Sequence, residues 1–209
     1  IERMKGGADV ALISDAGTPG ISDPGYRLVR LAVANSIPVV PVPGPSALIS
    51  VLSVSGLPAG EFTFKGFVPS ADGKRKRFFL GLKGRSHTYI MYESARRLME
   101  TLDTVIDLLG DVDAVIGREV TKLHEEVMRG KVSALREGLK ARDIKGEITL
   151  ILRTEDEKRR PEDLPADIGR LLKSGMGIKE ISKALAHEFD MPGAEVYREA
   201  LKVREGLKS

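Results

Sequence analysis

Two loops rich in glycine and proline carry the residues best suited to hold a ligand. The first runs from Ser14 to Gly25 and includes the carboxylate of Asp15; the second reads Pro43-Gly-Pro-Ser-Ala47. Glycine lets a ligand approach bare backbone and proline stiffens the chain, so these loops would present fixed amides and carbonyls. Neither has the spacing of a phosphate-cradling loop or of a dinucleotide fingerprint. One such loop is commonly an ordinary strand-to-helix turn, but two in succession favour a binding site.

A run of four cations, Lys74, Arg75, Lys76 and Arg77, is the second chemical feature. Residues 65–97 carry nine basic and two acidic side chains, a net charge of +7, whereas the whole chain carries only +3. A positive field confined to one place indicates that a polyanion docks there. The run therefore predicts a phosphate clamp, although a solvated loop or the start of a helix would show the same composition.

Short apolar runs precede both glycine loops. They predict strands over Val10–Ile13 and Ile37–Val42, with helices over Tyr26–Ala34 and Ser46–Ser55 after the loops. Alternating strands and helices are typical of a parallel sheet with crossover helices, and such sheets bind ligands at the loops that follow their strands. We expect both loops to lie on one rim of one sheet.

The chain divides into a first α/β domain over residues 1–58, a second over 59–158 and a helical module over 162–209. In the second domain, strands are predicted near Phe62–Phe67, His87–Tyr92, Ala114–Gly117 and Ile148–Leu152, and helices over 95–109 and 132–141. A charged linker, residues 154–163, leads to helices over Pro165–Ser174, Ile178–Phe189 and Ala194–Glu205. The last two resemble a helix-turn-helix, but a plain helical hairpin fits the same pattern.

The composition of the chain argues against several classes of protein. Of the 209 residues, 42% are hydrophobic, enough for a buried core, yet no apolar run reaches the roughly 18 residues that span a bilayer, and the start is not a signal peptide. The chain has no cysteine, which excludes disulfides and thiolate metal sites and fits the cytosol. No histidine and carboxylate cluster has metal-ligand spacing, so we expect no metal.

The string Ser14-Asp-Ala-Gly-Thr-Pro-Gly-Ile-Ser-Asp-Pro-Gly-Tyr-Arg-Leu-Val29, together with Pro43-Gly-Pro-Ser-Ala47, closely resembles the ribosomal RNA small-subunit methyltransferase I family. The likeness continues through Gly66-Phe-Val-Pro69, Tyr92-Glu-Ser94, Arg118-Glu-Val-Thr-Lys122 and Lys145-Gly-Glu147, in order, over nearly the whole chain. These proteins are cytidine 2′-O-methyltransferases with the tetrapyrrole methylase (class III) fold. The family has a strand, a loop and a helix ahead of the point where this sequence begins, so the resemblance implies that the first α/β domain is incomplete.

The resemblance implies S-adenosylmethionine as cofactor, small-subunit ribosomal RNA as partner, a homodimer and a cytoplasmic location. It places the cofactor against Asp15, Ala16, Gly17, Pro19, Gly20, Ile21, Ser46, Ala47, Tyr92 and Gly146. Asp15 would accept hydrogen bonds from the amino or ribose groups of the cofactor, although a carboxylate at a strand end also commonly caps the next helix.

On the acceptor side, the resemblance directs attention to Glu93, Arg118, Glu119 and Lys122. A carboxylate or a desolvated lysine could take the proton of a ribose hydroxyl, and an arginine could hold a phosphate. Structural pairing explains Arg118 and Glu119 equally well, and the choice of base between Glu119 and Lys122 stays open, as does acceleration by alignment alone.

Two other functions fit the pattern. A tetrapyrrole carbon methylase would share the fold, but it needs neither the cationic segment nor the helical tail. An RNA-binding module that lacks catalysis is the alternative outside the enzymes. Binding of S-adenosylmethionine separates both methylases from that module.

Overall fold

The computed structural model describes residues 1–15, 17–156, 161–189 and 191–206. They form two compact units, Ile1–Glu155 and Asp156–Ser209. None of the helices in the described ranges combines the length and apolar character needed to cross a bilayer.

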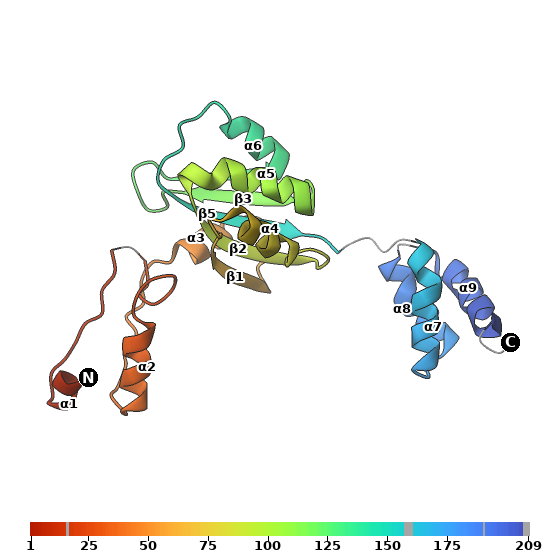
Figure 1. The fold of residues 1–209 in the computed structure, drawn as a ribbon, viewed down its shortest axis with the longest axis horizontal. Coiled ribbons are helices and arrows are strands. Elements are labelled where there is room, and N and C mark those ends of the chain that lie inside the picture. The colour runs from red at the N-terminus through yellow and green to blue at the C-terminus, as the bar shows by residue number, and fades with distance from the viewer. Residues whose placement is uncertain (16, 157–160, 190, 207–209) are drawn as a thin grey trace. The chain divides into compact units, whose positions relative to one another are not determined.

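A mixed five-stranded sheet organises the first unit (Figure 1). Its strands are β1 Phe62–Phe67, β2 His87–Ser94, β3 Asp113–Arg118, β4 Glu126–Lys131 and β5 Glu147–Thr154. They lie in the order β1-β2-β5-β3-β4. Only β1 and β2 are parallel, whereas the other three pairs of neighbours are antiparallel. The structure therefore contains the α/β fold that the sequence predicts, with a sheet that is mostly antiparallel.

Alternating side chains of the strands build two separate cores. One face of the sheet packs against α4 Asp72–Leu80, α5 Leu98–Leu109 and α6 Val132–Leu139. The other face packs against a short helix, α3 Ala47–Ser53, through Ile90, Val115 and Ile151. A side chain at Gly117 would clash with Val51, so glycine there lets α3 lie close against the sheet. The close contact fixes the start of α3 relative to the strand ends.

The two strands predicted at Val10–Ile13 and Ile37–Val42 are wrong. Between α1 Glu2–Lys5 and α2 Tyr26–Ala34, and between α2 and α3, the described residues form no strand. Ile13 is 84% exposed and Val42 is 86% exposed. A strand requires a hydrogen-bonded neighbour as well as an apolar pattern, and neither run has one among the described residues. The expected shared parallel sheet is therefore not formed.

The two glycine loops nevertheless lie side by side. The hydroxyl of Thr18 in the first loop donates to the carbonyl of Pro45 in the second, at 3.3 Å. Gly17, next to Thr18, has φ of +71°, a conformation that glycine adopts without strain. The two loops are thus held together by direct contact between them, and not by a common sheet rim as the sequence predicted.

The second unit is helical. It contains α7 Leu164–Lys173, α8 Ile178–Glu188 and α9 Gly193–Gly206, close to the three helices predicted. Their apolar faces share one core, which includes Ile168, Ile181 and Val196. Residues 157–160 of the predicted charged linker lie outside the described residues, and the helix-turn-helix interpretation stays a prediction.

Candidate ligand-binding cavity

A cavity of about 440 Å³ opens in the first unit, within the size range of sites for small ligands. Segments far apart in the sequence meet around it: the first glycine loop, the start of α3, the ends of β1 and β2, and the turn that enters β5. Its lining comprises Asp15, Gly17, Thr18, Ile21, Ser22, Asp23, Ser46, Ala47, Phe67, Tyr92, Glu93, Ser94, Val120, Gly146, Glu147, Ile148 and Thr149.

Most of the residues predicted to contact a cofactor share this cavity. The seven that line it are Asp15, Gly17, Ile21, Ser46, Ala47, Tyr92 and Gly146. Pro19 and Gly20 belong to the same loop but do not line the cavity, and Ala16 lies outside the described residues. Residues from four separate parts of the sequence thus converge on one space, the arrangement that a binding site requires.

An aromatic group forms part of the cavity wall. The Tyr92 ring lies with its centroid 5.0 Å from that of Phe64 and 5.4 Å from that of Phe67. Burial raises the pKa of the Tyr92 phenol above its ordinary value, so its hydroxyl keeps its proton at neutral pH. The wall therefore offers apolar ring surface and a neutral hydroxyl.

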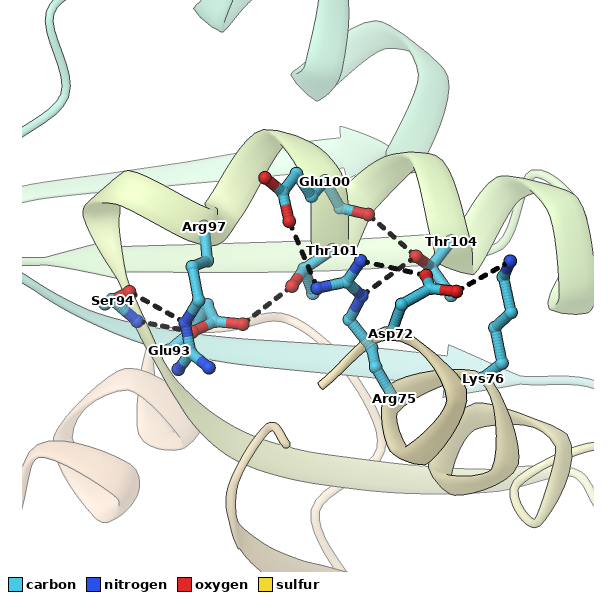
Figure 2. Close-up of polar contacts among 9 residues, drawn as sticks. All are labelled: Asp72, Arg75, Lys76, Glu93, Ser94, Arg97, Glu100, Thr101 and Thr104. Carbon is cyan, nitrogen blue, oxygen red and sulfur yellow. Dashed lines mark hydrogen bonds and ion pairs between the residues drawn. The ribbon is translucent and has the colours of Figure 1, made fainter. Parts of the chain in front are cut away.

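Glu93 has the contacts of a buried ion pair. Its carboxylate accepts from the backbone N–H of Ser94 and from the hydroxyl of Thr101, each at 2.6 Å, and it pairs with Arg97 at 2.6 Å (Figure 2). The Glu93 side chain has no exposed surface. Its carboxylate faces α5, so it is not open to a hydroxyl in the cavity.

The same network includes the hydroxyl of Ser94, a residue that lines the cavity. The Nε–H of Arg97 donates to Oγ of Ser94 at 3.1 Å, and Ser94 lines the cavity. Since Ser94 Oγ accepts from Arg97, its own hydrogen is left to point elsewhere. Glu93 therefore acts on the cavity through Arg97 and Ser94.

Glu119, Lys122 and Glu147 form an ionic clasp at the cavity edge. The ammonium of Lys122 lies 3.0 Å from a carboxylate oxygen of each glutamate, and Glu119 also accepts from the backbone N–H of Glu147 at 2.9 Å. Only Glu147 of the three lines the cavity. The hydrogen bond from Glu147 to Glu119 holds the turn at Gly146. Glu119 lies so close to this turn that a side chain at Gly146 would overlap that of Glu119.

The clasp shifts the protonation of both candidate bases. The backbone N–H of Glu147, and then Lys122, hold the pKa of Glu119 below its ordinary value. Hydrogen bonds to Glu119 and Glu147 raise the pKa of Lys122 above its ordinary value. Glu119 is therefore a weaker base than a free glutamate, and Lys122 stays a cation at neutral pH.

Strain in the backbone accompanies the clasp. Glu119 has φ of +48° and Thr121 has φ of +70°, conformations that cost free energy in residues other than glycine. Such strain gathers at binding and catalytic sites. The guanidinium of Arg118 donates through Nε to the carbonyl of Lys145 at 2.8 Å and lies 3.6 Å from Glu126, so its visible contacts are structural.

The basic run forms α4, and its four cations divide between two environments. Arg75 is 6% exposed and lies against α5, where it contacts Glu100 and Oγ1 of Thr104, each at 3.2 Å (Figure 2). Lys74, Lys76 and Arg77 are exposed. The phosphate clamp predicted from the run can thus use three of these side chains, while Arg75 joins α4 to α5.

Several lining residues escaped the sequence interpretation: Ser22, Asp23, Phe67, Ser94, Val120, Ile148 and Thr149. Most of them lie within or next to the motifs that carry the family resemblance. Those motifs could therefore have indicated that these residues line the cavity. No group of three or more potential metal-ligating side chains occurs in the described part of the chain.

Comparison with known proteins shows the family of this chain. The profile of the Tetrapyrrole (Corrin/Porphyrin) Methylases matches residues 1–136. The chain is 44% identical to a protein named "Ribosomal RNA small subunit methyltransferase I" from Mesorhizobium japonicum, over 98% of this chain and 70% of that protein. Proteins with the same name from Halalkalibacterium halodurans and Escherichia coli O157:H7 are 37% and 35% identical, over 94% and 97% of this chain and 71% and 72% of theirs.

The match over most of the chain to a methylase profile defines the class as a tetrapyrrole-methylase-type protein. Within that class, the chain belongs to the ribosomal RNA small subunit methyltransferase I family.

Proposed function

We propose that this chain transfers a methyl group from S-adenosylmethionine to the 2′-hydroxyl of a cytidine in small-subunit ribosomal RNA. The observation that carries the proposal is the convergence of Asp15, Ser46 and Tyr92 on one cavity, in a chain whose family is named for methylation of this RNA. The location that goes with this substrate is the cytoplasm.

The cavity suits the cofactor chemically. Carboxylates of Asp15, Asp23 and Glu147 line it and would attract the positive charges of the sulfonium and amino groups. The ring of Tyr92 supplies flat apolar surface in the same wall. When bound, S-adenosylmethionine supplies an electrophilic methyl group on sulfur. The part of the chain is to hold that group in line with the attacking oxygen, and such alignment lowers the barrier without a metal.

The chain offers the acceptor hydroxyl little general-base help. Lys122 is held protonated, Glu119 is a weakened base, and the Glu93 carboxylate is buried behind Ser94. We therefore assign Glu119 and Lys122 to shaping the Gly146 turn and Glu93 to positioning Ser94. Alignment then supplies most of the acceleration.

For the RNA, we propose that the exposed cations of α4 neutralise backbone phosphates. Lys74, Lys76 and Arg77 are exposed on one helix, and each neutralised phosphate would make binding more sensitive to salt. Arg118 stays a candidate phosphate contact, and two chains of a homodimer would together offer a longer basic surface to the small ribosomal subunit.

Calorimetric titration of the 209-residue chain with S-adenosylhomocysteine, followed by mass mapping of ribosomal RNA from cells that lack the protein, tests the proposal. We expect saturable binding and the loss of one ribose methyl group in the small-subunit RNA. Binding with methylation of a tetrapyrrole instead would reassign the chain to the carbon methylases. RNA binding without S-adenosylhomocysteine binding would instead indicate that the chain is an RNA-binding module that lacks catalysis.

The basic helix is tested by charge reversal of its exposed face. The double variant Lys74→Glu and Arg77→Glu should weaken RNA binding and flatten the dependence of log affinity on log salt by roughly two phosphate contacts. Arg75→Met is the matched control, because it removes the inward-facing cation of the same helix and should leave the salt slope unchanged. Equal slopes in all three proteins would remove α4 from the RNA surface.

A further inference from the structure

Strand β1 contains a bulge that changes which way its last side chain faces. Phe64 pairs with Ile90 of β2, and the next pair is Phe67 with Tyr92, so β1 advances three residues while β2 advances two. Gly66 stands in the irregularity with φ of +70°. An added side chain at Gly66 would meet only Ser22 Oγ at 3.8 Å, so glycine serves there for its backbone conformation rather than for lack of space.

The bulge brings two aromatic rings to the same side of the sheet. In a regular strand, residues three apart point to opposite faces. Here Phe64 and Phe67 both contact the ring of Tyr92, with centroids 5.0 and 5.4 Å away. Bulges beside functional sites commonly redirect a side chain in this manner. The bulge thus places the Phe67 ring beside that of Tyr92.

Phe67 lies in the wall of the cavity with much of its surface open. It is 57% exposed, whereas Phe64 is half-buried. Around it, the lining contains groups that hydrogen-bond, including Asp15, Ser46 and Glu147. A flat ring bound on Phe67 would therefore have polar partners at its edge, as a nucleoside requires.

We propose that Phe67 stacks on a nucleobase bound in the cavity, with Tyr92 supporting the ring from beside it. The inference rests on the proposed function, since that reaction brings two nucleobases to the site, the adenine of the methyl donor and the cytosine of the acceptor. Stacking on an aromatic side chain recognises the flat face that both share. Removing one such stack weakens binding by roughly tenfold.

The experiment compares Phe67→Leu with Phe67→Tyr. Leucine keeps an apolar side chain but removes the ring, whereas tyrosine keeps the ring, so loss in the first and recovery in the second separate stacking from simple burial. Phe62→Leu is the matched control, because Phe62 lies on β1, is 37% exposed and does not line the cavity. Gly66→Ala is a second variant that leaves the ring in place but opposes the backbone conformation that directs it.

Two titrations distinguish the bases. One measures S-adenosylhomocysteine binding by calorimetry; the other measures binding of a cytidine-containing RNA oligonucleotide with S-adenosylhomocysteine at saturation. A loss of about tenfold in the first for Phe67→Leu, restored by tyrosine, identifies adenine, and the same loss in the second alone identifies the acceptor base.

Either result supports the inference, and a matching loss in Gly66→Ala strengthens it. Affinities equal to those of the unmodified chain in both titrations, or equal losses in Phe62→Leu, would overturn it. If the unmodified chain itself binds neither probe, the proposed function fails and this inference falls with it.

Discussion

Two charged clusters beside the cavity use the same residue types in opposite ways. On the α5 side, Glu93 is fully buried and its partner Arg97 is partly buried. At the cavity edge, the side chain of Glu119 is 18% exposed, but those of Lys122 and Glu147 are 44% and 75% exposed. In the first cluster, protein donors alone solvate the carboxylate of Glu93. In the second, water also solvates the charged groups.

The difference shows how a carboxylate's role depends on its surroundings. Glu93 receives two hydrogen-bond donors and a guanidinium, so removing its charge leaves buried donors without an acceptor, which is costly. In the clasp, Lys122 and Glu147 are exposed enough to exchange a lost partner for water at little cost. We therefore expect changes in the buried cluster to affect stability first and changes in the exposed clasp to affect mainly the turn that it holds.

The largest effect is expected for Glu93→Gln. The substitution keeps the volume but removes the charge that pairs with Arg97, and it should lower the free energy of unfolding by about 3 kcal/mol. Urea denaturation monitored by circular dichroism measures it. Thr101→Val, which removes one neutral donor, should cost about 1 kcal/mol and serves as the control.

A different outcome would break the comparison. If Glu93→Gln kept its stability but lost methylation, with a change in the pH dependence of the rate, then Glu93 would be a proton acceptor rather than a positioning residue.

Gly146→Ala should have the next largest effect. Gly146 has φ of +96°, and an added side chain would overlap that of Glu119. The backbone strain should cost about 1–3 kcal/mol, and displacement of Glu119 should loosen the turn and weaken S-adenosylhomocysteine binding. Gly138→Ala, at a helical site with open space, is the control; it should raise stability by roughly 0.5–1 kcal/mol and leave ligand binding unchanged. Unaltered ligand binding in Gly146→Ala would separate the clasp from the cavity.

The sequence predicts four of the five strands of the sheet, because their patterns are local, whereas β4 was not predicted. His87–Tyr92 and Ile148–Leu152 are apolar runs bounded by polar residues, and they appear as β2 and β5. Val10–Ile13 looks the same in sequence but forms no ladder, since pairing depends on a neighbour that the run itself does not encode. Local pattern predicts that a segment can be a strand; the presence of a partner decides whether it becomes one.

The sequence motifs predicted many of the residues that line the cavity, but not the direction in which each side chain points. The run Lys74 to Arg77 reads as four equivalent cations, yet on a helix Arg75 shares a face with Phe79, four residues later, and both are buried. Phe67 was missed because an alternating strand pattern cannot reveal a bulge. In both cases the direction of a side chain, rather than its type, decided its role.

Arg75→Met sharpens the comparison from the cationic side. Arg75 is buried like Glu93, but its acidic partners Asp72 and Glu100 are exposed, 60% and 64%, and can return to water. Methionine also replaces much of the lost volume, so we expect a loss of only about 1 kcal/mol in unfolding free energy. Urea denaturation beside Glu93→Gln measures the contrast. A loss as large as that of Glu93→Gln would mean that burial of the removed charge, rather than the fate of its partners, sets the cost.

The smallest expected effect is the pH dependence that the clasp contributes. Because the pKa of Glu119 lies below its ordinary 4.5 in the folded chain, its contribution is present above about pH 4.5 and is lost as pH falls through the folded value. Because the pKa of Lys122 lies above its ordinary 10.5, its contribution is present below about pH 10.5 and is lost as pH rises through the folded value. Solvent and salt screen both, so the effect should shrink as sodium chloride is raised.

Comparing Lys122→Met with the unmodified chain across pH 3 to 11 isolates this contribution. The two stability curves should lie apart between the two limits and converge beyond them, with less separation at high salt. Curves that stay parallel over the whole range would mean that Lys122 contributes through packing of its methylenes, and the clasp would then resemble the buried cluster more than its exposure suggests.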